Sequence, residues 1–151
     1  MNLTYLGNKE LLKQYKIGFF CSRTVSGSAV LHCYDWATDV EIEKKVIVSG
    51  FQSKIEKDVL HLLLKRRAKV ILVMARSIYK QMPEELQRLL DDGSLLIVST
   101  ASTACRTGKS SADHRNEYIA QICDELVFGY IGEGSSLQLL FQNNKEKSVL
   151  L

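Results

Sequence analysis

The sequence lacks long apolar runs and lacks cysteines at metal-binding spacings. No stretch approaches the ~18 consecutive apolar residues that a membrane span needs. Residues 1–14 contain no basic stretch followed by an apolar block, so we expect no signal peptide. No Cys-x-x-Cys pair and no zinc-type cluster with histidine exists among Cys21, Cys33, Cys105 and Cys123. We therefore expect reduced thiols in a cytoplasmic protein without a metal site.

Motifs that mark common enzyme classes are also missing. No Gly-x-Gly-x-x-Gly follows the first apolar segment, which argues against the usual dinucleotide site. Neither a Gly-x-x-x-x-Gly-Lys-Ser/Thr loop nor a Gly-x-Ser-x-Gly nucleophile elbow occurs. No carboxylate or cysteine stands at a catalytic spacing from His32, His61 or His114. The sequence thus predicts a binding protein with no catalytic residues and no cofactor.

The composition is typical of one globular domain. The 151 residues are 46% apolar and 25% charged, which excludes a disordered chain. The formal net charge of +3 is mild and does not by itself indicate a nucleic-acid partner. We predict a single domain over residues 1–151, in which residues 1–15 form an N-terminal lead-in segment.

Short apolar segments alternate with amphipathic segments along the chain. This pattern predicts strands over residues 16–21, 45–48, 70–74, 95–98, 126–128 and 148–151. It predicts helices over residues 25–43, 53–67, 82–92, 115–123 and 135–141. Apolar strands joined by helices predict an α/β fold, a doubly wound, mostly parallel Rossmann-like sheet with helices on both faces. The connection over residues 99–113 has a length that is usually functional or mobile.

Polar residues follow the predicted strands directly. Ligands of such sheets bind at the carboxyl ends of the strands, where helix N-termini favour anions. Backbone N–H groups in these turns can form anion-binding nests, and arginines can add bidentate phosphate contacts. We therefore predict a phosphate-binding site formed by Ser22, Arg23, Ser49, Gly50, Arg76, Arg115, Asn116, Gly134, Ser135 and Ser136. Arg106 and Lys109, in the long loop, fall on the same predicted edge.

A second basic cluster lies at the opposite edge of the predicted sheet. Lys65, Arg66, Arg67 and Lys69 stand at a helix C-terminus, just before a strand begins. At that position they complement the helix dipole and keep the surface solvated. A DNA path that wraps onto this edge is the alternative interpretation.

Five short motifs occur in a characteristic order. They are Cys21-Ser22-Arg23, Ser49-Gly50, Ile55-Glu56, Arg115-Asn116 with Ile119-Ala120, and Gly134-Ser135-Ser136-Leu137. Together they resemble the Gly-Ser-Arg, Ser-Gly, Ile-Asp, Arg-Asn-Arg-x-Ile-Ala and Gly-Ser-x-Leu motifs of the DNA-processing protein A (DprA/Smf) family. The resemblance implies a Rossmann-like domain that binds single-stranded DNA, forms homodimers and helps to load a recombinase during transformation.

The chain departs from the family pattern at several positions. Lys54 stands where the family usually has glycine, and the family's histidine in the second helix is one residue out of register with His61. Glu117 replaces the second arginine of Arg-Asn-Arg, a charge reversal that weakens phosphate contact. The sequence contains no winged-helix extension. These departures favour a divergent, stand-alone relative whose ligand is either single-stranded DNA or a free nucleotide.

A nucleotide-processing enzyme is the alternative function. The lysine-decarboxylase-like phosphoribohydrolases share this sheet and carry Pro-Gly-Gly-x-Gly-Thr-x-x-Glu after a late strand. The matching stretch here is residues 131–138, with no proline and with Gln138 at the position of the catalytic glutamate. An amide cannot act as a general base or stabilise a cationic transition state as a carboxylate does. We therefore predict that the chain releases no base from nucleotides. A third possible function is an interaction domain that only dimerises.

Overall fold

Seven strands form one sheet in the computed structural model, which describes residues 3–101 and 110–151. They are β1 (Thr4–Gly7), β2 (Tyr15–Cys21), β3 (Lys45–Ser49), β4 (Lys69–Met74), β5 (Leu95–Ser99), β6 (Glu125–Tyr130) and β7 (Ser148–Leu150). Their order across the sheet is β1-β5-β4-β3-β2-β6-β7. Every neighbouring pair is parallel except β1 and β5, which are antiparallel.

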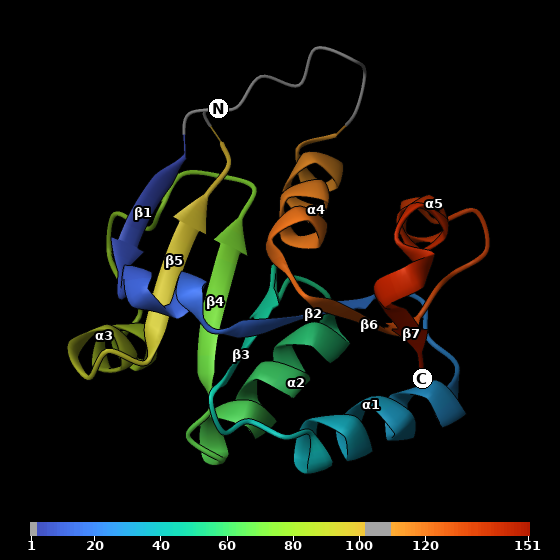
Figure 1. Cartoon of the computed structure of the whole chain (residues 1–151), viewed down its shortest axis with the longest axis horizontal. Helices are drawn as coiled ribbons and strands as arrows, with labels where there is room; N and C mark the ends of the chain where they lie inside the picture. The colour runs from blue at the N-terminus through green and yellow to red at the C-terminus, as the bar shows by residue number, and fades with distance from the viewer. Residues whose placement is uncertain (1–2, 102–109) are drawn as a thin grey trace.

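Helices cover both faces of the sheet (Figure 1). One face packs on α1 (Gly27–Asp39), α2 (Lys54–Lys65) and α3 (Glu84–Asp91), and the other packs on α4 (Ser111–Ile122), α5 (Ser136–Asn143) and the 3₁₀ turn η1 (Lys9–Lys13). Successive strand residues point to opposite faces, so Phe19 belongs to the first core and Phe20 to the second. The predicted doubly wound, mostly parallel α/β sheet is confirmed. No helix in the described part of the chain is long and apolar enough to cross a membrane.

The strand order reverses at β2. From β2 the chain builds outward through β3, β4 and β5, and it then returns to place β6 on the other side of β2. The pairing of Ile17 with Glu125 and of Phe20 with Phe128 sets the parallel register of β2 and β6. In doubly wound sheets, ligands bind in the crevice at the carboxyl ends of the two strands that flank such a reversal.

The sheet has one strand that the sequence does not predict. Residues 4–7 form β1 within the expected lead-in segment, and they pair with β5 from Thr4 opposite Ser99 to Gly7 opposite Leu96. Gly7 has a φ of +111°, and a Cβ there would collide with the Leu95 carbonyl oxygen. The short strand has no buried residue, and this explains why apolar periodicity does not reveal it.

The end of α1 and the start of α4 each differ from the predicted boundary by four residues. Ser26 is the N-cap of α1, and its hydroxyl accepts a hydrogen bond from Ala29 N. The helix ends at Asp39 rather than at residue 43. α4 begins at Ser111, four residues before the predicted start at Arg115, because Ser110 caps it by accepting a hydrogen bond from Asp113 N. Because β5 includes Ser99 and α4 begins at Ser111, the connection predicted over residues 99–113 is shorter at both ends. Cys105, Arg106 and Lys109 lie outside the described residues.

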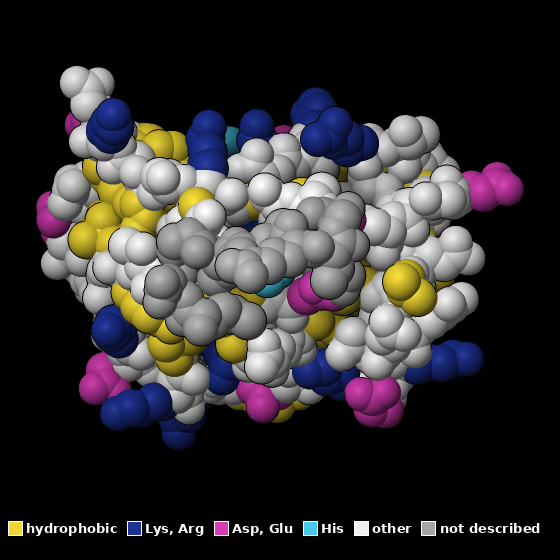
Figure 2. All heavy atoms as spheres, turned by 90° about the horizontal axis from the view of Figure 1, so that it is seen from above, with side chains coloured by type: hydrophobic (Ala, Val, Ile, Leu, Met, Phe, Trp, Pro, Cys, Tyr) yellow, Lys and Arg dark blue, Asp and Glu magenta, His cyan; other side chains and the backbone are white. Residues whose placement is uncertain are grey.

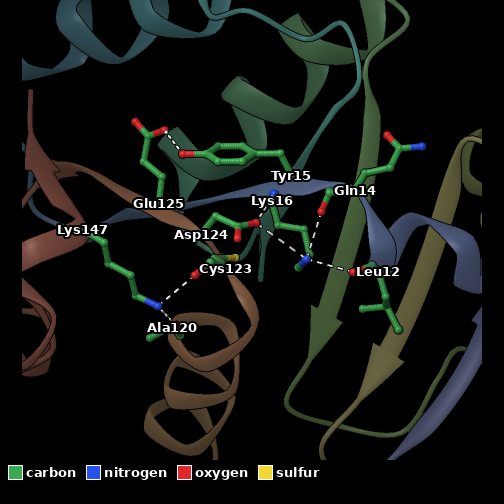
Figure 3. Close-up of polar contacts among 9 residues, drawn as sticks. All are labelled: Leu12, Gln14, Tyr15, Lys16, Ala120, Cys123, Asp124, Glu125 and Lys147. Carbon is green, nitrogen blue, oxygen red and sulfur yellow. Dashed lines mark hydrogen bonds and ion pairs between the residues drawn. The ribbon is translucent and has the colours of Figure 1, made fainter.

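Two lysines donate hydrogen bonds to backbone carbonyls near the N-terminal ends of β2 and β6 (Figure 3). Lys147, in the 3₁₀ turn η2 (Lys145–Lys147), donates from Nζ to the carbonyls of Ala120 and Cys123 at 2.6 and 2.8 Å. Lys16 donates from Nζ to the carbonyls of Leu12 and Gln14 at 2.8 and 2.9 Å. The Lys147 ammonium lies at the C-terminus of α4, where a positive charge complements the helix dipole.

Candidate phosphate-binding site

A cavity of about 620 Å³ opens at the carboxyl ends of β2 and β6. Its wall is formed by the turns that follow these two strands and by the first turns of α2, α4 and α5. The cavity therefore occupies the crevice at the strand-order reversal. Figure 2 shows the molecule from above the view of Figure 1, the side toward which β4 and β5 point, and the visible Lys and Arg side chains are spread mainly around the outline of this face.

Two hydrogen bonds of the Ser22 hydroxyl join the turns after β2 and β6. Ser22 Oγ accepts a hydrogen bond from Gly132 N at 2.8 Å and donates to Ser135 Oγ at 3.4 Å. Ser135 is the N-cap of α5, and its hydroxyl accepts from Leu137 N at 3.2 Å. Gly134 takes a φ of +74°, a left-handed conformation that suits glycine. The N-terminus of α5, where backbone donors attract anions, is thereby held at the cavity.

Arg115 is the buried cation of the cavity wall. Only 7% of its surface is exposed, and its Nε donates to Asn116 Oδ1 at 2.9 Å. Its guanidinium lies against Gly50. A Cβ added at Gly50 would stand only 2.5 Å from Arg115 Nη1 and 2.7 Å from Arg115 Cζ. Burial lowers the pKa of Arg115, whereas the carboxylates of Glu56 and Asp113 act in the opposite direction. Arginine keeps its charge despite such a shift, so the cavity contains a fixed cation.

Glu56 is the buried carboxylate of the same wall. Its Oε2 accepts from Cys21 N at 3.1 Å, and its Oε1 accepts from Gln52 N and Ser53 N at 2.9 and 3.1 Å. The carboxylate therefore joins the end of β2 to the turn that starts α2. The predicted site does not include Glu56. The Ser53-x-x-Glu56 spacing of a capping box is the sequence signal that identifies it, since Ser53 Oγ also accepts from Glu56 N.

The sequence profile of the DNA recombination-mediator protein A family matches residues 1–136. The chain belongs to this family. No curated protein matches the sequence.

Solved structures with the same fold include two DprA proteins. The protein from Streptococcus pneumoniae is 24% identical with a TM-score of 0.74, and the match covers 98% of this chain and 53% of that one. The Helicobacter pylori protein, described for its single-stranded DNA binding mode, is 19% identical with a TM-score of 0.67, and the match covers 98% of this chain and 70% of that one. The chain thus spans about half the length of the S. pneumoniae protein.

The fold also occurs outside the DprA family. The molybdenum cofactor binding protein from Rippkaea orientalis is 14% identical with a TM-score of 0.59, and the match covers 91% of this chain and 76% of that one. At these identities the structural likeness concerns the fold alone.

The structure brings together part of the predicted phosphate-binding site. Six of the predicted residues line the cavity: Ser22, Arg23, Arg115, Asn116, Ser135 and Ser136. Arg23 and Ser136 are exposed, whereas Arg115 is buried. The motifs after β2, at the start of α4 and before α5 therefore meet at one place, although they lie far apart in the sequence.

The other four predicted residues lie outside the cavity wall. Ser49 is fully buried, and its Oγ accepts a hydrogen bond from Phe51 N. Gly50 packs against the Arg115 guanidinium. Gly134 shapes the turn before α5. Arg76 is exposed at the end of β4, with its guanidinium 5.6 Å from the centre of the Tyr79 ring. Because β3 separates β4 from β2, Arg76 belongs to a different part of the carboxyl edge.

The charges in the cavity wall are mixed. Arg23 and Arg115 supply the positive charge, and Glu56, Asp113 and Glu133 supply carboxylates. The Glu56 carboxylate accepts hydrogen bonds from three backbone N–H groups, whose dipoles partly offset its negative charge. A phosphate at this site would therefore meet two guanidinium groups and the N-terminus of α5.

Proposed function

We propose that this chain binds single-stranded DNA by placing a backbone phosphate in the cavity at the ends of β2 and β6. Arg115 and Arg23 contact the phosphate oxygens, and the serine-capped N-terminus of α5 adds backbone donors. The observation that carries the proposal is the buried Arg115 guanidinium, which is fixed against Gly50 where the N-termini of three helices converge. Such preorganisation lowers the entropic cost of binding.

Membership of this family supports a proposal for the biological role of the chain. A DprA-like chain that binds single-stranded DNA would act in DNA uptake or recombination. The H. pylori relative, whose single-stranded DNA binding mode has been described, supports this choice of ligand. A homodimer and a recombinase partner remain predictions from the family resemblance.

A free nucleotide is the second candidate ligand. The carboxylates of Asp113 and Glu133 stand in the cavity wall, and carboxylates accept hydrogen bonds from sugar hydroxyls. Gln138, at the position of the catalytic glutamate in the phosphoribohydrolases, is exposed on α5 and is not part of the wall. We therefore propose nucleotide binding, rather than hydrolysis, as the alternative.

Competition binding tests the choice of ligand. Fluorescence polarisation of labelled oligo(dT) would be measured with the whole chain, and a panel of unlabelled nucleoside monophosphates would be added as competitors. Saturable oligo(dT) binding that mononucleotides displace only at large excess supports single-stranded DNA. Displacement by one mononucleotide at an equal or lower concentration supports the second candidate, and no binding of either ligand contradicts both.

A further inference from the structure

Two cysteine thiols meet in the core beside the candidate site. Cys21 is the last residue of β2 and lines the cavity, whereas Cys33 lies in α1. Both are buried, with 4% and 0% of their surfaces exposed, and both belong to the same core. Both cysteines are reduced in the structure.

Gly129 on β6 provides the space for both sulfur atoms. A Cβ at Gly129 would collide with Cys33 Sγ and would stand 3.4 Å from Cys21 Sγ. The two sulfurs therefore lie over the same residue of the strand that neighbours β2. They also share a hydrogen bond, which lowers the pKa of Cys33 and raises that of Cys21.

We propose that Cys21 and Cys33 form a reversible intramolecular disulfide when a peroxide reaches them, and that this disulfide weakens ligand binding in the cavity. The second half of the proposal rests on the proposed function. The first half is independent of it, because the thiols meet in the core whatever the cavity binds.

The chemistry needs only the two thiols and one molecule of hydrogen peroxide. The peroxide enters through the cavity, which Cys21 lines, and oxidises one thiol to a sulfenic acid while one water leaves. The other sulfur, as thiolate, then attacks the sulfenic sulfur, so that the S–S bond forms and a second water leaves. The two thiols lose two electrons and two protons, and the peroxide is reduced to two waters. An added dithiol reverses the reaction by exchange.

The backbone of Cys21 connects this pair to the site. Cys21 N donates to Glu56 Oε2 at 3.1 Å, and the next residue, Ser22, accepts from Gly132 N. A covalent bond to α1 pulls Cys21 away from the position that these contacts define. Oxidation should therefore disturb the turn that places Ser22 and Arg23 in the cavity wall.

Peptide mapping tests the pair directly. The reduced full chain would be treated with hydrogen peroxide, remaining thiols would be alkylated, and the digest would be analysed by mass spectrometry. We expect a peptide in which Cys21 is joined to Cys33, with the loss of two hydrogen atoms, and we expect dithiothreitol to remove it. No cross-link, or one that joins either cysteine to Cys105 or Cys123 instead, overturns the proposal. Because mapping uses the native sequence, the result does not depend on a variant that folds.

Two variants and a binding measurement test the consequence. Oxidation should lower oligo(dT) affinity about tenfold, the scale of one lost charge-assisted contact, and reduction should restore it. Cys33→Ala should bind like the native chain when reduced and should resist peroxide, whereas Cys123→Ala should respond like the native chain. A mapped cross-link with unchanged affinity overturns the coupling to the site. If the reduced chain binds no oligo(dT), the proposed function fails while the mapping still decides on the disulfide.

Discussion

At the scale of single residues, the candidate site depends on the close approach of Arg115 to Gly50. The Gly50→Ala variant would place a methyl group 2.5 Å from Arg115 Nη1, so the guanidinium must move. We expect oligo(dT) affinity to fall about tenfold, the scale of one weakened charge-assisted contact. Fluorescence polarisation would measure the change, and circular dichroism would check the fold.

Gly27→Ala is the matched control for this substitution. Gly27 is the first residue of α1, and a Cβ there meets no atom within 4 Å. This variant should bind oligo(dT) as the native chain does. Equal affinity of the Gly50→Ala and Gly27→Ala variants would contradict the role of Arg115.

Glu56 offers a second test at this scale. The Glu56→Gln variant keeps the shape of the side chain. Its amide N–H₂ group, however, must face at least one backbone N–H that donates to a carboxylate oxygen in the native chain. We expect the free energy of unfolding to fall by about 1–3 kcal/mol. Urea denaturation would measure it, with the exposed Glu43→Gln as the control. A loss no larger than that of the control would show that the three hydrogen bonds contribute nothing.

At the scale of elements, a hydrogen bond joins α1 to α2. Tyr34 Oη donates to Asp58 Oδ2 at 2.6 Å, and this bond, together with Lys54, lowers the pKa of Asp58. A lowered folded-state pKa stabilises the fold above the unfolded pKa and loses this effect as the pH falls through the folded value. Asp58→Asn should therefore destabilise the chain more near neutral pH than at a pH of about 3, which lies below the ordinary aspartate pKa of about 3.9. Urea denaturation at the two pH values would measure it, and an equal loss at both would contradict the prediction.

Lys147 provides a second test at this scale. Its ammonium donates to two carbonyls at the C-terminus of α4, and Lys147→Met keeps much of the apolar stem while removing both donors. We expect the midpoint of urea denaturation to fall, with a loss of about 1–3 kcal/mol in the free energy of unfolding. The exposed Lys145→Met is the control. If both variants unfold at the same midpoint, α4 does not depend on this contact.

The elements also show how far the sequence alone leads. The parallel strands are predictable because buried strands read as apolar runs, as Val46 to Val48 in β3 illustrates. β1 is not predictable in this way, since its stability comes from backbone pairing with β5 rather than from buried side chains. The true start of α4 has a signal, the Ser110 cap, but a cap without apolar residues beside it also reads as a loop.

At the scale of the whole molecule, strand order decides which predicted residues meet. The sequence places Ser22, Ser135, Arg115 and Arg76 at the same edge of the sheet, because all follow strands or begin helices. It does not reveal that β6 lies beside β2, which brings Ser22 within 3.4 Å of Ser135 across 113 positions in the sequence. The same order leaves Arg76 at a separate place. Strand order depends on long-range packing, which local patterns do not encode.

The most direct measurement compares oligo(dT) binding by variants of basic residues at the two edges of the sheet. Arg115→Ala and Arg23→Ala should each weaken binding about tenfold to a hundredfold, and each should reduce the slope of log affinity against log salt by about one contact. Arg23 is exposed, so its variant tests the site even if loss of the buried Arg115 harms the fold. Lys65→Ala, at the opposite edge, should bind as the native chain does. If Lys65→Ala loses affinity while Arg23→Ala and Arg115→Ala retain it, DNA binds at the other edge and the cavity between β2 and β6 is not the phosphate site.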